Sequence, residues 1–194
     1  MKLTLSRSKV ATSELKTRPP LQTILNTILF QLMWFSTIKL ASLDLELIAT
    51  LPGLLIGGYF VYQQNVSISH RTKLRWGLGG IIMGIVVEGA FINFGLFHPI
   101  SPPYLIIPVW LLSLWFSLFT LLPIELDKIL ISPTKSAIFG LVGAPISYIS
   151  GANLGAMNLG SDVSQVVALT GCGWGVSMYL CARIWVKTQG EPIN

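Results

Sequence analysis

Apolar side chains fill six long stretches of the chain, and short polar connections separate them. A helix needs about 20 mostly apolar residues to cross the roughly 30 Å of a bilayer's hydrocarbon core. Because these runs show no alternation of period two, they are predicted to be helices and not strands. The predicted spans are residues 21–41, 45–62, 76–96, 104–122, 137–157 and 163–185. The pattern predicts an all-α protein, a polytopic bundle of six transmembrane helices.

The composition excludes an ordinary soluble domain. Of the 194 residues, 52% are hydrophobic and only 11% are charged, whereas soluble domains carry about a quarter charged residues. The mean hydropathy is +0.68. Residues 1–20 form a polar, basic arm, residues 21–186 the transmembrane domain and residues 187–194 a short polar tail. The lipid bilayer is therefore the expected surrounding of the fold.

The positions of the basic residues predict the orientation of the helices. Cytoplasmic loops carry an excess of lysine and arginine. When six helices are threaded, the arm, the two basic connections at 63–75 and 123–136 and the C-terminal end all fall on one side. Both termini are therefore predicted to be cytoplasmic. The net charge of +5 is spread over loops and forms no basic stripe, so no nucleic-acid partner is expected.

Glu88 is the most informative polar residue of the sequence. It is near the centre of the third predicted span, where an acid is costly and usually faces protein or water. Gly80 and Gly84 precede it at intervals of four, which places all three residues on one helical face. No lysine or arginine lies at a matching depth. Glu88 is therefore expected to point into the bundle.

Other polar side chains in the spans complete a candidate intramembrane polar site. Its members are Glu88, Asn93, Asn26, Gln31, Ser147, Tyr148 and Asn153. Two interpretations are open: hydrogen bonds that only join helices, or a working site that exchanges a proton or binds a polar ligand.

Small residues at helical spacing predict where helices approach one another closely. The candidate packing positions are Gly80, Gly84, Gly143, Gly151, Gly155, Gly171 and Gly175. The fifth and sixth predicted spans both carry such rows, so a close pair of these two helices is expected. The same faces are suited to packing a second copy of the chain or a membrane partner.

The chain lacks the usual signatures of enzymes, metal sites and cofactor sites. His70 and His98 are predicted in loops on opposite sides, so neither reaches a serine at membrane depth. The sequence has no H-E-x-x-H motif and no phosphate-binding G-x-x-x-x-G-K-[ST] loop. Cys172 and Cys181 are nine residues apart, too far for a metal-binding pair on one helix. No metal and no cofactor are expected.

Several segments carry a resemblance to a known family. They are residues 26–35 (NTILFQLMWF), Glu88, residues 108–110 (PVW), Leu114-Trp115 and residues 143–156 (GAPISYISGANLGA). With these segments the chain resembles an uncharacterised family of small multi-pass bacterial inner-membrane proteins, which is known as a domain of unknown function. The resemblance implies a location in the bacterial inner membrane and supplies no reaction.

Two functions are compatible with these features. The first is a small proton-linked transporter or permease-like protein, in which Glu88 exchanges a proton at the centre of the bundle. The alternative is a structural or assembly protein, in which the small-residue faces pack a partner or a second copy. A membrane-embedded enzyme is disfavoured, and the sequence does not identify a substrate.

Overall fold

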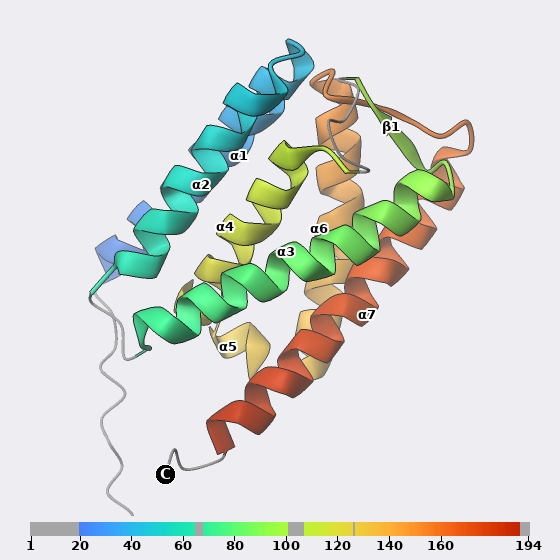
Figure 1. Ribbon diagram of the computed structural model, residues 1–194. Coiled ribbons are helices and arrows are strands. Elements are labelled where there is room, and N and C mark those ends of the chain that lie inside the picture. The colour runs from blue at the N-terminus through green and yellow to red at the C-terminus, as the bar shows by residue number, and fades with distance from the viewer. Residues whose placement is uncertain (1–19, 65–67, 101–106, 126, 191–194) are drawn as a thin grey trace, which may run out of the picture.

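The computed structural model describes residues 20–64, 68–100, 107–125 and 127–190 (Figure 1). Helices dominate this part of the chain. They are α1 (Pro20–Ser42), α2 (Glu46–Tyr62), α3 (His70–Asn93), α4 (Val109–Glu125), the short α5 (Asp127–Leu130), α6 (Pro133–Asn153) and α7 (Val163–Gly190). The six long helices correspond in order to the six predicted spans.

Local capping explains where several helices start. The Ser69 side chain accepts a hydrogen bond from the backbone N–H of Thr72, so α3 begins at His70 and not at Trp76. Ser132 caps α6 in the same way, and Pro133 occupies the first turn, where its missing N–H costs nothing. At the start of α7, the Asp162 carboxylate accepts hydrogen bonds from the backbone N–H groups of Ser164 and Gln165.

The ends of α3 and α6 share one backbone device. Gly95 and Gly155 follow the two helices with φ angles of +67° and +85°, a left-handed conformation that glycine adopts without strain. The chain turns there and enters a short strand in each case. The fifth predicted span, residues 137–157, is therefore too long at its C-terminal end, because α6 ends at Asn153.

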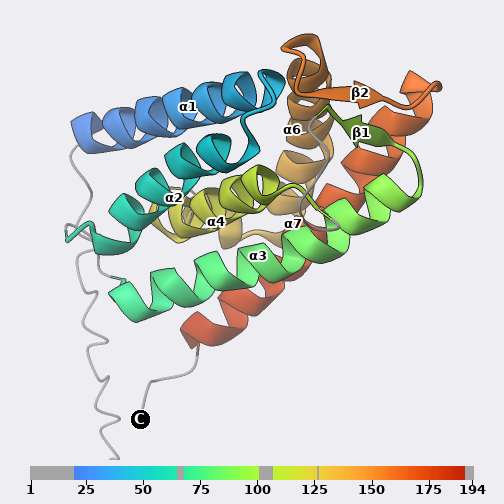
Figure 2. The ribbon, with the colours of Figure 1, turned by 45° about the horizontal axis from the view of Figure 1, so that its top comes forward.

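The expectation of an all-α protein was incomplete. Strands β1 (Phe97–Pro99) and β2 (Met157–Leu159) form an antiparallel pair, in which His98 lies opposite Asn158. Figure 2 shows the pair bridging the connections that follow α3 and α6. Three-residue strands fall below the length at which an alternating pattern can be detected in a sequence.

The helices support the expectation of a membrane protein. Three of them are long and apolar enough to cross a bilayer: Leu21–Ser42 within α1, α3, and Val163–Thr188 within α7. Helices α2 and α4 are apolar but shorter. Many large apolar side chains face outward, such as Leu55 and Ile82, which is a poor arrangement in water and a suitable one in lipid.

Helix α4 packs closely against α2 and α3, and Figure 2 shows it between them. Glycines make this close approach possible. A Cβ atom built on Gly80 would lie 2.6 Å from the side chain of Phe119, and one on Gly84 would lie 2.7 Å from the indole of Trp115. Gly53 of α2 faces Ser113 of α4 in the same way. These glycines bring backbones together inside one chain.

Helices α6 and α7 form the close pair that their small residues predict. A Cβ atom on Gly140 would lie 2.5 Å from the backbone oxygen of Trp174. On the other helix, a Cβ atom on Gly171 would lie 2.8 Å from the backbone oxygen of Leu141, and one on Gly175 would lie 3.3 Å from that of Ala137. The two backbones are therefore in direct contact.

Three of the candidate packing glycines depart from the prediction. Gly143 has no neighbouring atom within 4 Å of a built Cβ, because its side of α6 borders a cavity. Gly151 faces Met157 of β2 and Ile38 of α1 and does not contact α7 there. Gly155 lies beyond the end of α6 and forms the turn into β2.

Candidate functional site

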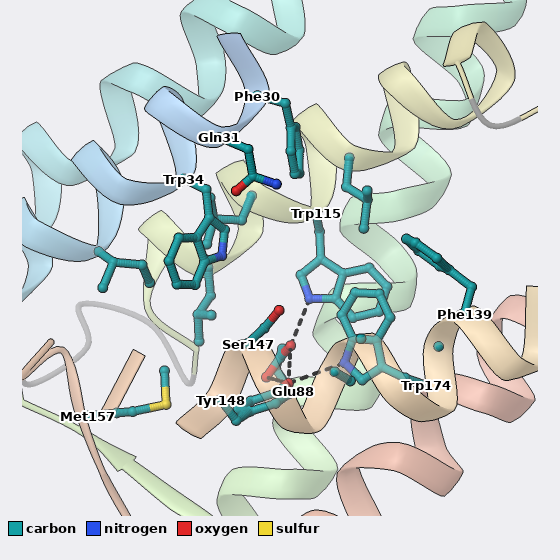
Figure 3. Close-up of a pocket in the computed structure, with 17 residues that line it drawn as sticks. Phe30, Gln31, Trp34, Glu88, Trp115, Phe139, Ser147, Tyr148, Met157 and Trp174 are labelled. Carbon is teal, nitrogen blue, oxygen red and sulfur yellow. Dashed lines mark hydrogen bonds between the residues drawn. The ribbon is translucent and has the colours of Figure 1, made fainter. Parts of the chain in front are cut away.

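The carboxyl group of Glu88 is held by side chains from two other helices (Figure 3). The indole Nε1–H of Trp115, on α4, donates to Oε1 at 2.8 Å. The hydroxyl of Tyr148, on α6, lies 2.7 Å from both Oε1 and Oε2. Glu88 is only 1% exposed, so protein surrounds the carboxyl group as the sequence predicts.

A fourth residue extends this network. The indole Nε1–H of Trp174, on α7, donates to the Tyr148 hydroxyl oxygen at 3.3 Å. The rings of Trp115 and Trp174 are stacked with their centroids 4.1 Å apart. The network thus joins four helices, α3, α4, α6 and α7, and each polar atom in it has a partner. This satisfaction is what a buried polar group requires.

Glu88 lies at the floor of a cavity of about 230 Å³. Its walls come from α1, α3, α4, α6, α7 and β2. The lining residues are Phe30, Gln31, Trp34, Ile38, Glu88, Leu111, Leu114, Trp115, Leu118, Phe139, Gly140, Gly143, Ala144, Ser147, Tyr148, Met157 and Trp174. The cavity occupies the space between α1 and α6, each of which packs mainly on other helices.

The chemistry of the lining is aromatic, with one acid. Among the described residues that border the cavity, none is a lysine, arginine or histidine. The donors that reach Glu88 from Trp115 and Tyr148 are neutral. Aromatic side chains cover the walls on several sides, as Figure 3 shows for Phe30, Trp34 and Phe139. The site can accept hydrogen bonds and present aromatic faces to a ligand.

The structure brings together four of the seven predicted polar residues. Glu88 and Tyr148 are in direct contact, and Gln31 and Ser147 border the same cavity. Gln31 and Ser147 are both exposed, so they lie toward the open side of the cavity, whereas Glu88 lies at its floor.

Asn26 belongs to a different cluster, which lies near the end of the bundle where α1 begins. Its amide Nδ2 donates to Oε1 of Gln63 at 3.2 Å and also to a carboxyl oxygen of Glu125. Gln22 and Gln63 in turn donate to its Oδ1 at 3.1 and 3.0 Å. Asn26 is fully buried. This cluster joins α1 to the ends of α2 and α4, as helix-joining hydrogen bonds would.

Asn93 and Asn153 are apart from both clusters. Each is the last residue of its helix, α3 and α6 respectively, and each side chain is exposed. Neither borders the cavity. Their places beside the glycine turns explain this, because the chain leaves the helix there and passes toward the strand pair.

Sequence reasoning missed the two tryptophans of the network, Trp115 and Trp174, because the candidate polar site contained no tryptophan. A signal was present for Trp115. It lies near the middle of the fourth predicted span, and an indole N–H at that depth needs an acceptor. Glu88 was the acceptor at a matching depth.

Two further buried charged residues were also missed. Glu46 is 4% exposed at the start of α2, where its Oε1 accepts a hydrogen bond from the backbone N–H of Val109 at 2.8 Å. Lys73 is fully buried in the first turn of α3, where its Nζ donates to the backbone oxygen of Gln63 at 2.8 Å. The sequence prediction placed Lys73 in the connection at 63–75 and Glu46 at the start of the second predicted span, and it made neither a candidate site residue.

The described part of the chain offers little for a metal ion. Within it, no group of three or more histidine, cysteine, aspartate or glutamate side chains comes together. Cys172 is exposed and Cys181 is buried, and both are free thiols.

Comparison with known proteins gives one relationship. No curated protein and no solved structure matches the chain. Residues 23–180 match the family described as "Protein of unknown function (DUF2878)". The matched segment contains α2, α3, α4 and α6 entirely, most of α1 and α7, and all residues that border the cavity. Since the match covers more than half of its length, the chain belongs to this family of unknown function.

Proposed function

We propose that this protein is a small proton-linked transporter of the bacterial inner membrane, with six membrane-spanning helices and both termini in the cytoplasm. The observation that carries the proposal is the position of Glu88. Its carboxyl group is buried, yet it borders a cavity between α1 and α6. An acid at membrane depth is expensive, and its place at a cavity gives it access to a proton and to a ligand.

The hydrogen bonds around Glu88 are suited to proton exchange. Trp115 can only donate, because an indole nitrogen has no free lone pair. The hydroxyl of Tyr148 can donate or accept, so its bond to Glu88 can reverse when the carboxyl group takes up a proton. Trp115 therefore fixes the position of one carboxyl oxygen, while Tyr148 accommodates both protonation states.

The alternative, a structural or assembly protein, has less support. It requires small-residue faces that remain free for a partner. The packing glycines Gly80, Gly84, Gly140 and Gly171 instead contact helices of the same chain. Of the packing positions that the sequence predicted, Gly143 has no atom within 4 Å of a built Cβ, and its side of α6 borders the cavity. The structure thus uses its small residues to assemble the bundle and to leave space beside Glu88.

The test compares Glu88→Gln with Glu46→Gln. Both variants neutralise a buried acid, but Glu46 does not border the cavity. Each protein is reconstituted in liposomes that contain a pH-sensitive dye, and organic cations, organic anions and neutral solutes are added in turn. At least one class should drive proton movement with the wild type and with Glu46→Gln, and not with Glu88→Gln. Two results would contradict the proposal: proton movement that is retained in Glu88→Gln, or the absence of proton movement with every class of solute in the wild type.

A further inference from the structure

The open side of the cavity lies at mid-height on the two helices that flank it. Gln31 is at the centre of α1, and Gly143 is at the centre of α6. The residues beside them face outward and are apolar: Leu32 is 59% exposed, and Ile146 is 60% exposed. Surfaces of this kind face lipid in a helical membrane protein. A molecule that enters between α1 and α6 therefore comes from the hydrocarbon region, and it must be soluble there.

The floor of the cavity determines the charge that such a molecule would carry. Glu88 receives hydrogen bonds from Trp115 and Tyr148, both neutral, and no described lining residue is basic. When the carboxyl group has lost its proton, nothing in the lining balances its charge. A cation would do so, and an anion would be repelled.

The walls are also suited to a cation, in particular one that is weakly hydrated. Aromatic rings attract cations through the negative potential of their faces, and cages of such rings recognise quaternary ammonium groups. Trp34, Trp115, Trp174 and Phe139 border the cavity, and they come from four helices, α1, α4, α7 and α6 respectively. Figure 3 shows these rings around the position of Glu88.

The volume limits the size of the ligand. A cavity of about 230 Å³ is smaller than the roughly 300 to 1,000 Å³ that drug-sized ligands occupy. It suits one ring, or a short alkyl body, with a small cationic head. A phospholipid headgroup is disfavoured as the occupant, because the opening lies far from the headgroup layer and the lining has no basic side chain for a phosphate.

We propose that the cavity binds a small lipophilic organic cation, such as a quaternary ammonium compound, which reaches Glu88 from the bilayer between α1 and α6. This inference rests on the proposed function, in which the same carboxyl group carries the proton. Cation and proton then compete for Glu88. Tyr148 is the only other titratable side chain among the described lining residues, and it stays in contact with the carboxyl group in either state.

The binding experiment uses a pair of water-soluble probes of similar size and opposite charge. Radiolabelled benzyltrimethylammonium and benzylsulfonate are each dialysed to equilibrium against the purified full chain in an uncharged maltoside detergent. The cation should bind at least about tenfold more tightly than the anion. Equal binding of the two probes, or tighter binding of the anion, overturns the inference.

Two pairs of variants locate the site. Glu88→Gln should weaken cation binding about tenfold or more, while Glu46→Gln should leave it unchanged. Gly143→Leu should fill the cavity and abolish binding, whereas Gly79→Leu should not. Both glycines have no atom within 4 Å of a built Cβ, so neither substitution meets a neighbour at that atom. Cation binding that is unaffected by both Glu88→Gln and Gly143→Leu overturns the inference.

The two proposals fail in different ways. If another class of solute drives Glu88-dependent proton movement and benzyltrimethylammonium does not bind, the cation site is rejected and the transporter proposal is retained. If the cation binds in a Glu88-dependent way and no solute drives proton movement in liposomes, the transporter proposal is rejected and the cation site is retained.

Discussion

The indole nitrogen of Trp115 lies 2.8 Å from Oε1 of Glu88, although the two residues are 27 positions apart in the chain. This bond joins α3 to α4, and both side chains are buried. A buried donor or acceptor that loses its partner keeps the full cost of its desolvation. The pair is therefore a structural contact as well as part of the candidate site.

Replacing Trp115 by phenylalanine should destabilise the protein by about 1 to 3 kcal/mol more than the same change at Trp110. Both indoles are buried and lose similar volume in the substitution. Trp115 donates to Glu88, whereas the Nε1 of Trp110 has no hydrogen-bond partner among the described residues. Thermal unfolding in detergent measures the difference. Equal destabilisation of the two variants contradicts the role given to this hydrogen bond.

Two glycines on α6 should respond in opposite ways to alanine. A Cβ atom at Gly140 would lie 2.5 Å from the backbone oxygen of Trp174, so Gly140→Ala should push α6 from α7 and cost about 1 to 3 kcal/mol. Gly143→Ala adds a methyl group to open space and should stabilise the helix by about 0.5 to 1 kcal/mol. Thermal unfolding of the two variants measures the difference in stability between them. Equal stability of the two variants contradicts the close α6–α7 contact.

The stability of the first turn of α7 should depend on pH through the ionisation of Asp162. Hydrogen bonds from Ser164 and from the backbone of Gln165 hold the pKa of this exposed carboxyl group below its ordinary value. Its stabilising effect is therefore complete above the ordinary aspartate pKa and is lost as the pH falls through the lower, folded value. Asp162→Ala should lower the melting temperature at neutral pH, and the gap to wild type should close toward low pH. Asp162→Asn keeps a capping acceptor and serves as the control; a gap that is constant with pH contradicts the prediction.

The six-span topology predicts which loops an impermeant thiol reagent reaches. In a chain without cysteines, made with Cys172→Ala and Cys181→Ala, Asn158→Cys should react in intact cells, because β2 would lie on the outer side. Arg71→Cys should react only after the membrane is opened. Both positions are exposed in the structure. The six-span topology places three spans, α3, α4 and α6, between the two positions, so reaction of both from the same side would contradict that odd number of spans.

The six long helices could be predicted because each is a long apolar run, and such runs depend on local composition alone. The contact between Glu88 and Tyr148 could not. Sequence spacing shows that each residue lies on the inner face of its helix, but the rotation of α3 relative to α6 depends on packing across the whole bundle. The same limit applies to Asn26 of α1, because its partners Gln63 and Glu125 lie at the ends of two other helices, α2 and α4, which only the fold brings together.

The strand pair β1–β2 ties the connection after α3 to the connection after α6 through backbone hydrogen bonds. These bonds depend little on side-chain identity, so the strand pair is a fixed connection, here called the seam, between α3 and α6 at one end of the molecule. Any change in the distance between α3 and α6 that keeps the seam closed has to be small there and larger at the opposite end. The α6–α7 pair would then rotate about the end that carries the strand pair. The opening to Glu88 would widen most at the opposite end of the bundle.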